Sequence, residues 1–223
     1  MKSIHYLSLL PALSAGILAL GSTATAAVTS VGDFLVIDNV VDANFSQTGF
    51  GGSDTLQPDS WNGDRDWGNG GAATTATWNW GTGIAGDSPL GNGVYDIYAS
   101  WRNGVQGNLN DAIFTGTDGW AGITVDQVPG TSSFAGTLGI ATLNDGSQNI
   151  DFVLLGSATV SDGTFSLTMT DDAVNANFIH VDAAALRHVP DGGDADNDGM
   201  PDEFEDQHGL NRKDAGDASL DGD

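Results

Sequence analysis

The sequence contains no cysteine, only six lysine and arginine residues, and only two glutamates, Glu203 and Glu205. Without cysteine the chain cannot form disulfide bonds, so an exported form depends on its core and on bound metal for stability. The shortage of basic residues leaves a formal net charge of −24. This charge argues against nucleic acid and anionic membranes as electrostatic partners.

Sequence motifs of common enzymes are also missing. There is no G-x-S-x-G nucleophile turn, no H-E-x-x-H zinc motif and no phosphate-binding glycine loop. His180 and Asp182 lie two residues apart and could form an acid–base pair on one strand face. The alternative, which we favour, is that Asp182 binds a neighbouring loop and that His180 is a core or rim residue. The sequence therefore favours a protein that is not an enzyme.

The abundant residue is glycine, at 32 positions, which favours many turns over long helices. Between the turns, apolar and polar residues alternate, most clearly in residues 95–101, 121–127 and 164–170. A period of two residues is typical of half-buried β-strands. No segment before the acidic C-terminal region has helical periodicity, so the sequence predicts an all-β fold.

Turn sequences indicate how these strands connect. Asn144-Asp145-Gly146-Ser147 and Asp162-Gly163 each separate two apolar runs, as in β-hairpins. Residues 177–187 read as one closing strand with two apolar faces. Roughly eight to ten short strands at this length predict a jelly-roll-like β-sandwich, which we assign to residues 27–189.

Short motifs follow one another along this domain: Val36-Ile37-Asp38-Asn39, Thr77-Trp78, the run from Gly93 to Trp101, Thr124-Val125-Asp126-Gln127, Leu138-Gly139 and Val181-Asp182-Ala183. In this order they resemble the golvesin C-terminal-like domain, a β-sandwich module attached to secreted lyases, peptidases and surface proteins. The resemblance covers most of residues 34–188 and implies a non-catalytic module that binds carbohydrate. The chain departs from the family at Phe134, where a tryptophan is usual, and in residues 51–71, which read as a long inserted loop.

Residues 1–26 have the pattern of a signal peptide. Lys2 supplies the charged start, residues 6–20 are mostly apolar, and Ala24-Thr25-Ala26 is a small-residue cleavage site. The apolar run is too short and too interrupted for a good membrane span. We therefore expect a secreted protein, extracellular or at the cell surface, whose mature chain does not insert into the membrane.

Residues 194–205 match the ligand register of an EF-hand calcium loop. Oxygen-bearing side chains fall at loop positions 1, 3, 5, 9 and 12, and Gly199 stands at position 6. The predicted ligands are carboxylates and one backbone carbonyl: Asp194, Asp196, Asp198, Met200 through its carbonyl, Asp202 and Glu205. The alternative is a solvated acidic run, but the spacing, the glycine and the final glutamate together favour Ca²⁺ as the cofactor.

The acidic segment as a whole, residues 190–223, resembles the bacterial relatives of thrombospondin type-3 repeats, which share the Asp-x-Asp-x-Asp-Gly loop. Pro190-Asp191-Gly192-Gly193 reads as a linker to the sandwich. A second repeat starts near Asp217 or Asp221. We therefore expect the repeat segment to be incomplete.

Two tryptophans are candidates for ligand binding. Trp61 and Trp67 lie in a polar, glycine-rich stretch, where an exposed indole could stack on the apolar face of a sugar ring. The alternative, given equal weight, is that both rings cover an edge of the core. Because of the negative charge, we expect neutral glycans first, and acidic glycans only with calcium as a bridge.

The sequence therefore predicts a secreted, non-catalytic calcium-binding module that serves adhesion, matrix association or polysaccharide binding, with a polysaccharide or cell-surface glycan as partner. A first alternative is a polysaccharide-degrading enzyme, either a lyase or a glycoside hydrolase, or an accessory domain of one. A second alternative is a structural spacer or surface-layer component. Glycan binding separates the first prediction from the spacer, and product release separates it from the enzyme.

Overall fold

The computed structural model describes residues 28–40, 44–55, 57–69, 74–81, 90–103, 109–171 and 177–189, and residues 200, 205, 210–211, 214 and 216 of the acidic segment. Its described residues between 28 and 189 form 14 β-strands and two short 3₁₀ helices, η1 (Trp61–Gly63) and η2 (Thr131–Gly136). The strands belong to three sheets, and all strand pairs in these sheets are antiparallel. The all-β sandwich predicted from the sequence is confirmed.

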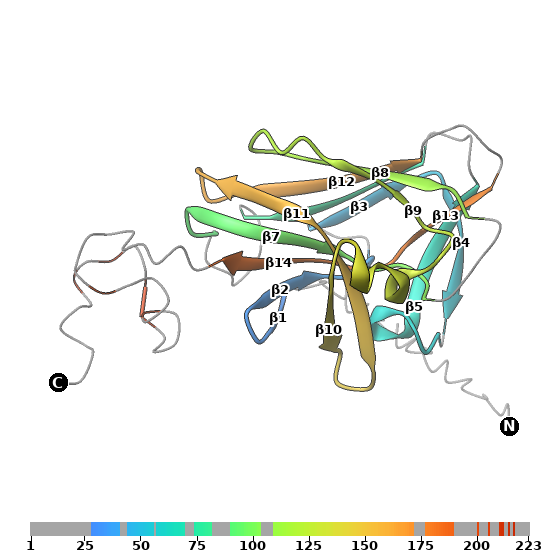
Figure 1. The fold of residues 1–223 in the computed structure, drawn as a ribbon, viewed down its shortest axis with the longest axis horizontal. Coiled ribbons are helices and arrows are strands. Elements are labelled where there is room, and N and C mark those ends of the chain that lie inside the picture. Colours follow the sequence, from blue (N-terminus) through green and yellow to red (C-terminus); the bar gives the residue numbers. More distant parts are fainter. Residues whose placement is uncertain are drawn as a thin grey trace, which may run out of the picture.

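Two large sheets form the body of the sandwich, and a small third sheet lies at one end of them (Figure 1). The six-stranded sheet has the order β1 (Thr29–Val31), β2 (Phe34–Ile37), β14 (Ala184–Val189), β7 (Gly93–Ala99), β11 (Asn149–Val160) and β10 (Ile140–Asn144). The five-stranded sheet has the order β3 (Phe45–Thr48), β6 (Thr75–Trp80), β12 (Phe165–Asp171), β8 (Asp111–Gly116) and β9 (Ile123–Asp126). The three-stranded sheet has the order β13 (Phe178–Val181), β5 (Asp64–Asn69) and β4 (Phe50–Thr55).

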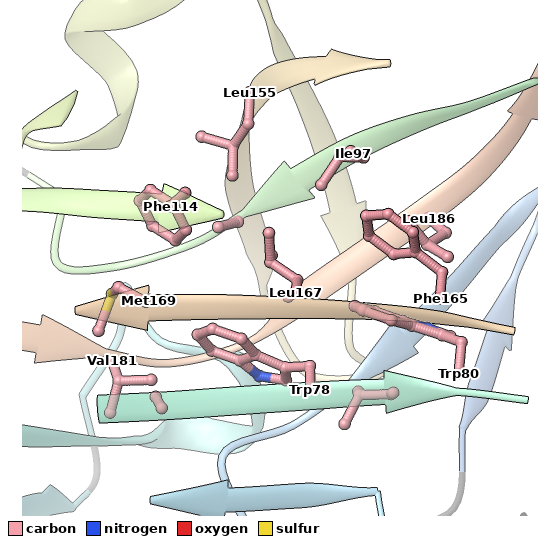
Figure 2. Packing of buried hydrophobic residues seen from close by; sticks show 14 of the residues in the cluster. Trp78, Trp80, Ile97, Phe114, Leu155, Phe165, Leu167, Met169, Val181 and Leu186 are labelled. Atoms are coloured by element: carbon pink, nitrogen blue, oxygen red, sulfur yellow. The ribbon is translucent and has the colours of Figure 1, made fainter. Parts of the chain in front are cut away.

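The main hydrophobic core lies between the two large sheets, because each presents its apolar face to the other. In β12, Phe165, Leu167 and Met169 are at most 1% exposed, whereas Ser166 and Thr168 on the other face are half-buried. Figure 2 shows side chains from the two sheets meeting in this core: Ile97, Leu155 and Leu186 from one sheet, and Trp78, Trp80, Phe114, Phe165, Leu167 and Met169 from the other. Burying a large apolar side chain contributes roughly 1.5–3 kcal/mol, so this cluster is the main source of stability.

The structure confirms one of the two predicted hairpins and corrects the other. Strands β10 and β11 pair around the turn at residues 145–148. The Asp162-Gly163 turn instead carries the chain from β11 in the six-stranded sheet to β12 in the five-stranded sheet. Val160 pairs with Gly93 and Phe165 pairs with Trp80, so the two arms are not partners. The buried side chains of β12 need the opposite wall of the core, and this requirement prevails over the local turn pattern.

The prediction of a single closing strand over residues 177–187 is also wrong, because these residues contain two strands that belong to different sheets. Strand β13 ends at Val181 in the three-stranded sheet, and β14 begins at Ala184 in the six-stranded sheet. Between them lies Asp182, which is fully buried. Its carboxylate accepts hydrogen bonds from the Trp61 backbone N–H and from the Ser100 hydroxyl, and these contacts fix the point where the chain changes sheets.

Residues 51–71, predicted to be a long loop, contain most of the three-stranded sheet. Strands β4 and β5 pair with each other, and β5 also pairs with β13, more than 100 residues away in the sequence. Glycine and aspartate disfavour strands in isolation. Here the pairing on both sides of β5 and the burial of Arg65 compensate for that tendency.

Candidate functional site

A pocket of about 260 Å³ lies on one face of the three-stranded sheet, lined by Asp54, Trp67, Phe178 and His180. Residues opposite each other in an antiparallel pair share a face of the sheet. His180 is opposite Trp67, and Asp54 is opposite Arg65, which is two residues before Trp67 on β5. Ile179 and Val181 point the other way, into the main core. The pocket therefore lies on the face of this sheet that is turned away from the core.

Two aromatic rings form the apolar part of the pocket. Trp67 and Phe178 are both half-buried, and their rings meet edge to face with centroids 5.1 Å apart and planes 85° apart. Gly52, opposite Trp67 on β4, leaves room for the indole. A Cβ atom at Gly52 would lie 2.0 Å from the Cε2 atom of Trp67. The position of the Trp67 ring therefore depends on the absence of a side chain at residue 52.

The buried side-chain amide of Gln127 makes two hydrogen bonds with the backbone of His180. The His180 N–H donates to Gln127 Oε1 at 2.9 Å, and Gln127 Nε2 donates to the His180 carbonyl at 2.9 Å. Within the described part of the chain, the Nδ1 atom of the His180 ring has no hydrogen-bond partner. His180 is 6% exposed, so this is a buried polar atom in a residue that lines the pocket.

Burial keeps the His180 imidazole neutral. Burial is the largest cause, and together with the nearby positive charges of Arg65 and Arg102 it lowers the pKa of His180 from 6.5 to about 4. The carboxylates of Asp54 and Asp59 oppose this shift with a smaller effect. At pH 7 one ring nitrogen can therefore donate a hydrogen bond and the other can accept one.

Asp54 supplies a carboxylate whose position is set by Arg65. The Arg65 side chain is 2% exposed, and its Nη2 atom lies 3.4 Å from Asp54 Oδ2. Its Nη1 atom donates to Asp59 Oδ1 at 2.9 Å. Gln57 Oε1 also accepts from Nη2 at 3.3 Å. Asp54 keeps 39% of its side-chain surface exposed, so it can accept hydrogen bonds from a ligand.

A separate group of buried carboxylates holds η1 against the large sheets. Asp38 is 8% exposed and accepts from the Asn39 N–H at 2.8 Å and from Asn62 Nδ2 at 2.7 Å. Burial raises the pKa of Asp38 to about 6, with a smaller contribution from the charge of Asp64. Burial also raises the pKa of Asp182 well above its usual value. These carboxylates are surrounded by protein donors and hold the loop in place.

The less favoured of the two interpretations of His180 and Asp182, an acid–base pair, is not found in the described residues. The two side chains have different surroundings, and among the described residues no hydrogen bond joins them. Asp182 binds η1 and the Ser100 hydroxyl, which is the structural alternative stated above. His180 faces the pocket with Trp67 and Asp54.

The structure separates the two candidate tryptophans. Trp61 is 2% exposed and packs edge to face on Phe152 with ring centroids 5.5 Å apart, so it belongs to the core. Trp67 lines the pocket. Its neighbours Asp54, Phe178 and His180 could not be identified from the sequence. A motif spacing could not have revealed them, because they meet Trp67 only through strand pairing.

Most of the predicted calcium ligands lie outside the described residues, namely Asp194, Asp196, Asp198 and Asp202. The other two, Met200 and Glu205, are described and are 8% and 0% exposed. In the described ranges, no group of three or more histidine, aspartate or glutamate side chains is arranged to hold a metal ion. The same ranges contain no helix that is long and apolar enough to cross a membrane.

A comparison with solved structures finds a distant similarity. No protein-family model matches the chain, and no curated protein matches it. The solved structure of a Paenibacillus xanthan lyase aligns with 71% of this chain at a TM-score of 0.46 and 18% sequence identity. The aligned part is 13% of that lyase chain, so the present chain corresponds to a small part of its length.

Proposed function

We propose that this protein is an exported, non-catalytic β-sandwich module that binds polysaccharide through the pocket of the three-stranded sheet. The observation that carries the proposal is the composition of this pocket. It combines a half-buried indole with a neutral imidazole and an arginine-held carboxylate. Few polar groups placed around apolar rings are typical of small-ligand sites.

The chemistry of a sugar ring matches these groups. The C–H face of a pyranose packs against an indole, while its hydroxyls both donate and accept hydrogen bonds. The Asp54 carboxylate can accept hydrogen bonds from sugar hydroxyls. A neutral imidazole can donate a hydrogen bond with one nitrogen and accept one with the other. The pocket therefore offers an apolar wall and both kinds of hydrogen-bonding group within a small space.

The described lining of the pocket differs from that of a glycoside hydrolase. Retaining and inverting enzymes use two carboxyl groups on either side of the scissile bond. Among the described residues, the lining contains one carboxylate, Asp54, and this group is paired with Arg65. This composition supports binding over hydrolysis.

The second part of the proposal is that residues 194–205 bind Ca²⁺ and order the acidic segment. The donor set is made entirely of oxygens, as a hard cation requires. Glu205, the residue expected to bind through both carboxylate oxygens, is fully buried. When bound, the ion would neutralise clustered negative charge and stiffen the segment next to the sandwich.

Retention on insoluble polysaccharides tests the proposal. The full chain, with calcium, is applied to cellulose, chitin, xylan, mannan and alginate gels, and the supernatants are assayed for released sugars. We expect retention on at least one neutral polymer with no product release. Trp67→Ala should weaken this retention about tenfold or more, because a buried tryptophan is a typical binding hot spot.

Trp120→Ala is the matched control, since Trp120 is also half-buried but does not line the pocket. It should keep wild-type retention, with folding of both variants checked by thermal unfolding. No retention on any polymer would overturn the proposal. Release of sugars would favour the enzyme alternative instead.

A further inference from the structure

Charged groups of both signs surround His180, although the protein as a whole is strongly acidic, with a formal net charge of −24. The positive groups are the guanidiniums of Arg65 and Arg102, and the negative groups are the carboxylates of Asp54 and Asp59. Arg65 pairs with both carboxylates, at 3.4 Å from Asp54 and 2.9 Å from Asp59. Because the Arg65 charge and the two carboxylates are paired with each other, they favour a neutral ligand over a charged one.

The size of the pocket limits how much of a polymer it can hold. Its volume of about 260 Å³ is below the roughly 300–1,000 Å³ typical of sites for drug-sized ligands. Among the described residues, its aromatic lining consists of one edge-to-face pair, Trp67 and Phe178, so its apolar surface is small. The pocket therefore matches a single sugar ring better than several consecutive rings.

The buried Nδ1 atom of His180 is a candidate hydrogen-bonding partner for such a ring. Buried polar atoms in folded proteins nearly always have a hydrogen-bond partner, and one without a partner needs an explanation. The Nδ1 atom of His180 has none within the described residues, although Gln127 fixes the backbone of the same residue through two hydrogen bonds. A ligand hydroxyl that reaches this atom from the pocket would supply the missing partner, as an ordered water molecule would in the free protein.

From these observations we infer that the pocket recognises one uncharged sugar unit, which stacks on Trp67 and hydrogen-bonds to the His180 imidazole and the Asp54 carboxylate. This inference rests on the proposed function and narrows it from polysaccharide in general to a single neutral ring. Gly52 is a positioning residue, because it sets the place of the Trp67 indole without contacting the sugar.

Calorimetric titration of the full chain with methyl glycosides tests the ligand. The neutral probes are the methyl glycosides of glucose, galactose, mannose, xylose and N-acetylglucosamine, and the charged probes are those of glucuronic acid and glucosamine. At least one neutral probe should bind, and its affinity should be within about tenfold of that of the matching oligosaccharide, because one ring makes most of the contacts. Tighter binding of a charged probe would overturn the inference.

Two adjacent glycines give a matched pair of variants. Gly52→Ala should weaken binding about tenfold or more, because the new methyl group displaces the Trp67 ring. Gly51→Ala should bind like the wild type, because a Cβ atom at Gly51 meets nothing within 4 Å. Equal affinities of the two variants would overturn the role of Gly52.

Two substitutions at His180 test its ring nitrogens. His180→Phe keeps a planar ring but removes the hydrogen-bonding atoms, so binding should weaken about tenfold. His180→Gln should recover part of the affinity. Wild-type affinity in the His180→Phe variant would contradict the assignment.

The results also distinguish failure of the inference from failure of the proposed function. If a polymer is retained through Trp67 but no monosaccharide glycoside binds, the single-ring inference is wrong and the polysaccharide-binding function stands. If no polymer is retained, both are wrong.

Discussion

His180 and Asp182 are two residues apart, both are buried, and their surroundings differ in a way that separates binding from structure. The Asp182 carboxylate is satisfied by protein donors, the Trp61 N–H and the Ser100 hydroxyl. The His180 ring lines a pocket and has a nitrogen without a partner in the described residues. A buried polar group with its own partners fixes the fold, whereas one without them needs another partner, such as a water molecule or a ligand.

The largest expected effect on the free energy of unfolding comes from removing the Asp182 carboxylate, which accepts hydrogen bonds from two protein donors. Asp182→Ala should lower the free energy of unfolding by about 2–5 kcal/mol, because it leaves two buried donors without an acceptor. Urea denaturation at pH 7 measures this loss. The control is Asp33→Ala, which changes an exposed turn residue and should cost about 1 kcal/mol or less. Similar losses in both variants would contradict the structural role of Asp182.

The second-largest expected effect is a pH dependence of the free energy of unfolding that comes from His180. The pKa of His180 is about 4 in the folded protein, below the usual 6.5, so the unfolded chain takes up the proton first as the pH falls. This group's stabilising contribution is present above pH 6.5 and is lost as the pH falls through about 4, at a cost of about 3 kcal/mol. His180→Phe should therefore remove about that much of the change in unfolding free energy between pH 6.5 and 4. Parallel profiles of variant and wild type would show that His180 is not kept neutral by burial.

Asp38 should give a somewhat smaller effect of the opposite sign. Its folded pKa of about 6 exceeds the usual 3.8, so the folded protein holds the proton more tightly. The stabilising contribution is present below pH 3.8 and is lost as the pH rises through about 6. Asp38→Asn should thus gain about 1–3 kcal/mol relative to the wild type on going from pH 4 to pH 8, measured by urea denaturation. If Asp38→Asn instead gained stability relative to the wild type as the pH falls from 8 to 4, burial would not be the cause of the raised pKa of Asp38.

The smallest expected effect on the sandwich comes from calcium. Asp198→Ala should weaken Ca²⁺ binding by the full chain strongly, whereas Asp217→Ala should not, because only Asp198 is a predicted ligand. Both variants should leave the melting temperature of the sandwich within about 2 °C of the wild type, since its strands end at Val189. Calorimetry and thermal unfolding measure the two quantities. Equal Ca²⁺ affinities would remove the assignment of the loop.

Sequence periodicity predicted the parts of the fold that depend on local burial. The inward residues of β12, the β10–β11 hairpin and the all-β class follow from alternation and turn chemistry. The sheet to which each strand belongs could not be predicted. The Asp162-Gly163 turn has the composition of a hairpin, but the partners of β12 are β6 and β8. That choice depends on how the whole core is filled, not on the turn.

The residues of the candidate site were harder still to predict, because they come together only through the pairing of strands that are far apart in the sequence. Trp61 and Trp67 have similar polar and glycine-rich neighbours, and only the pairing of β5 with β13 shows that one of them meets His180 and Phe178. β4 and β5 contain glycine and several aspartates, so their apolar pattern is too weak to define a register. The sequence could therefore nominate Trp67, but not the residues that form a pocket with it.

The indole N–H signals of Trp61 and Trp67 test the pocket assignment in one NMR titration of the ¹⁵N-labelled full chain. The chain has six tryptophans, and the signals are assigned by Trp67→Phe and Trp61→Phe variants. On addition of the best-retained neutral glycan, the Trp67 signal should shift progressively and the Trp61 signal should stay in place. A shift of Trp61, or of any other indole, with Trp67 unchanged would show that the sugar binds elsewhere.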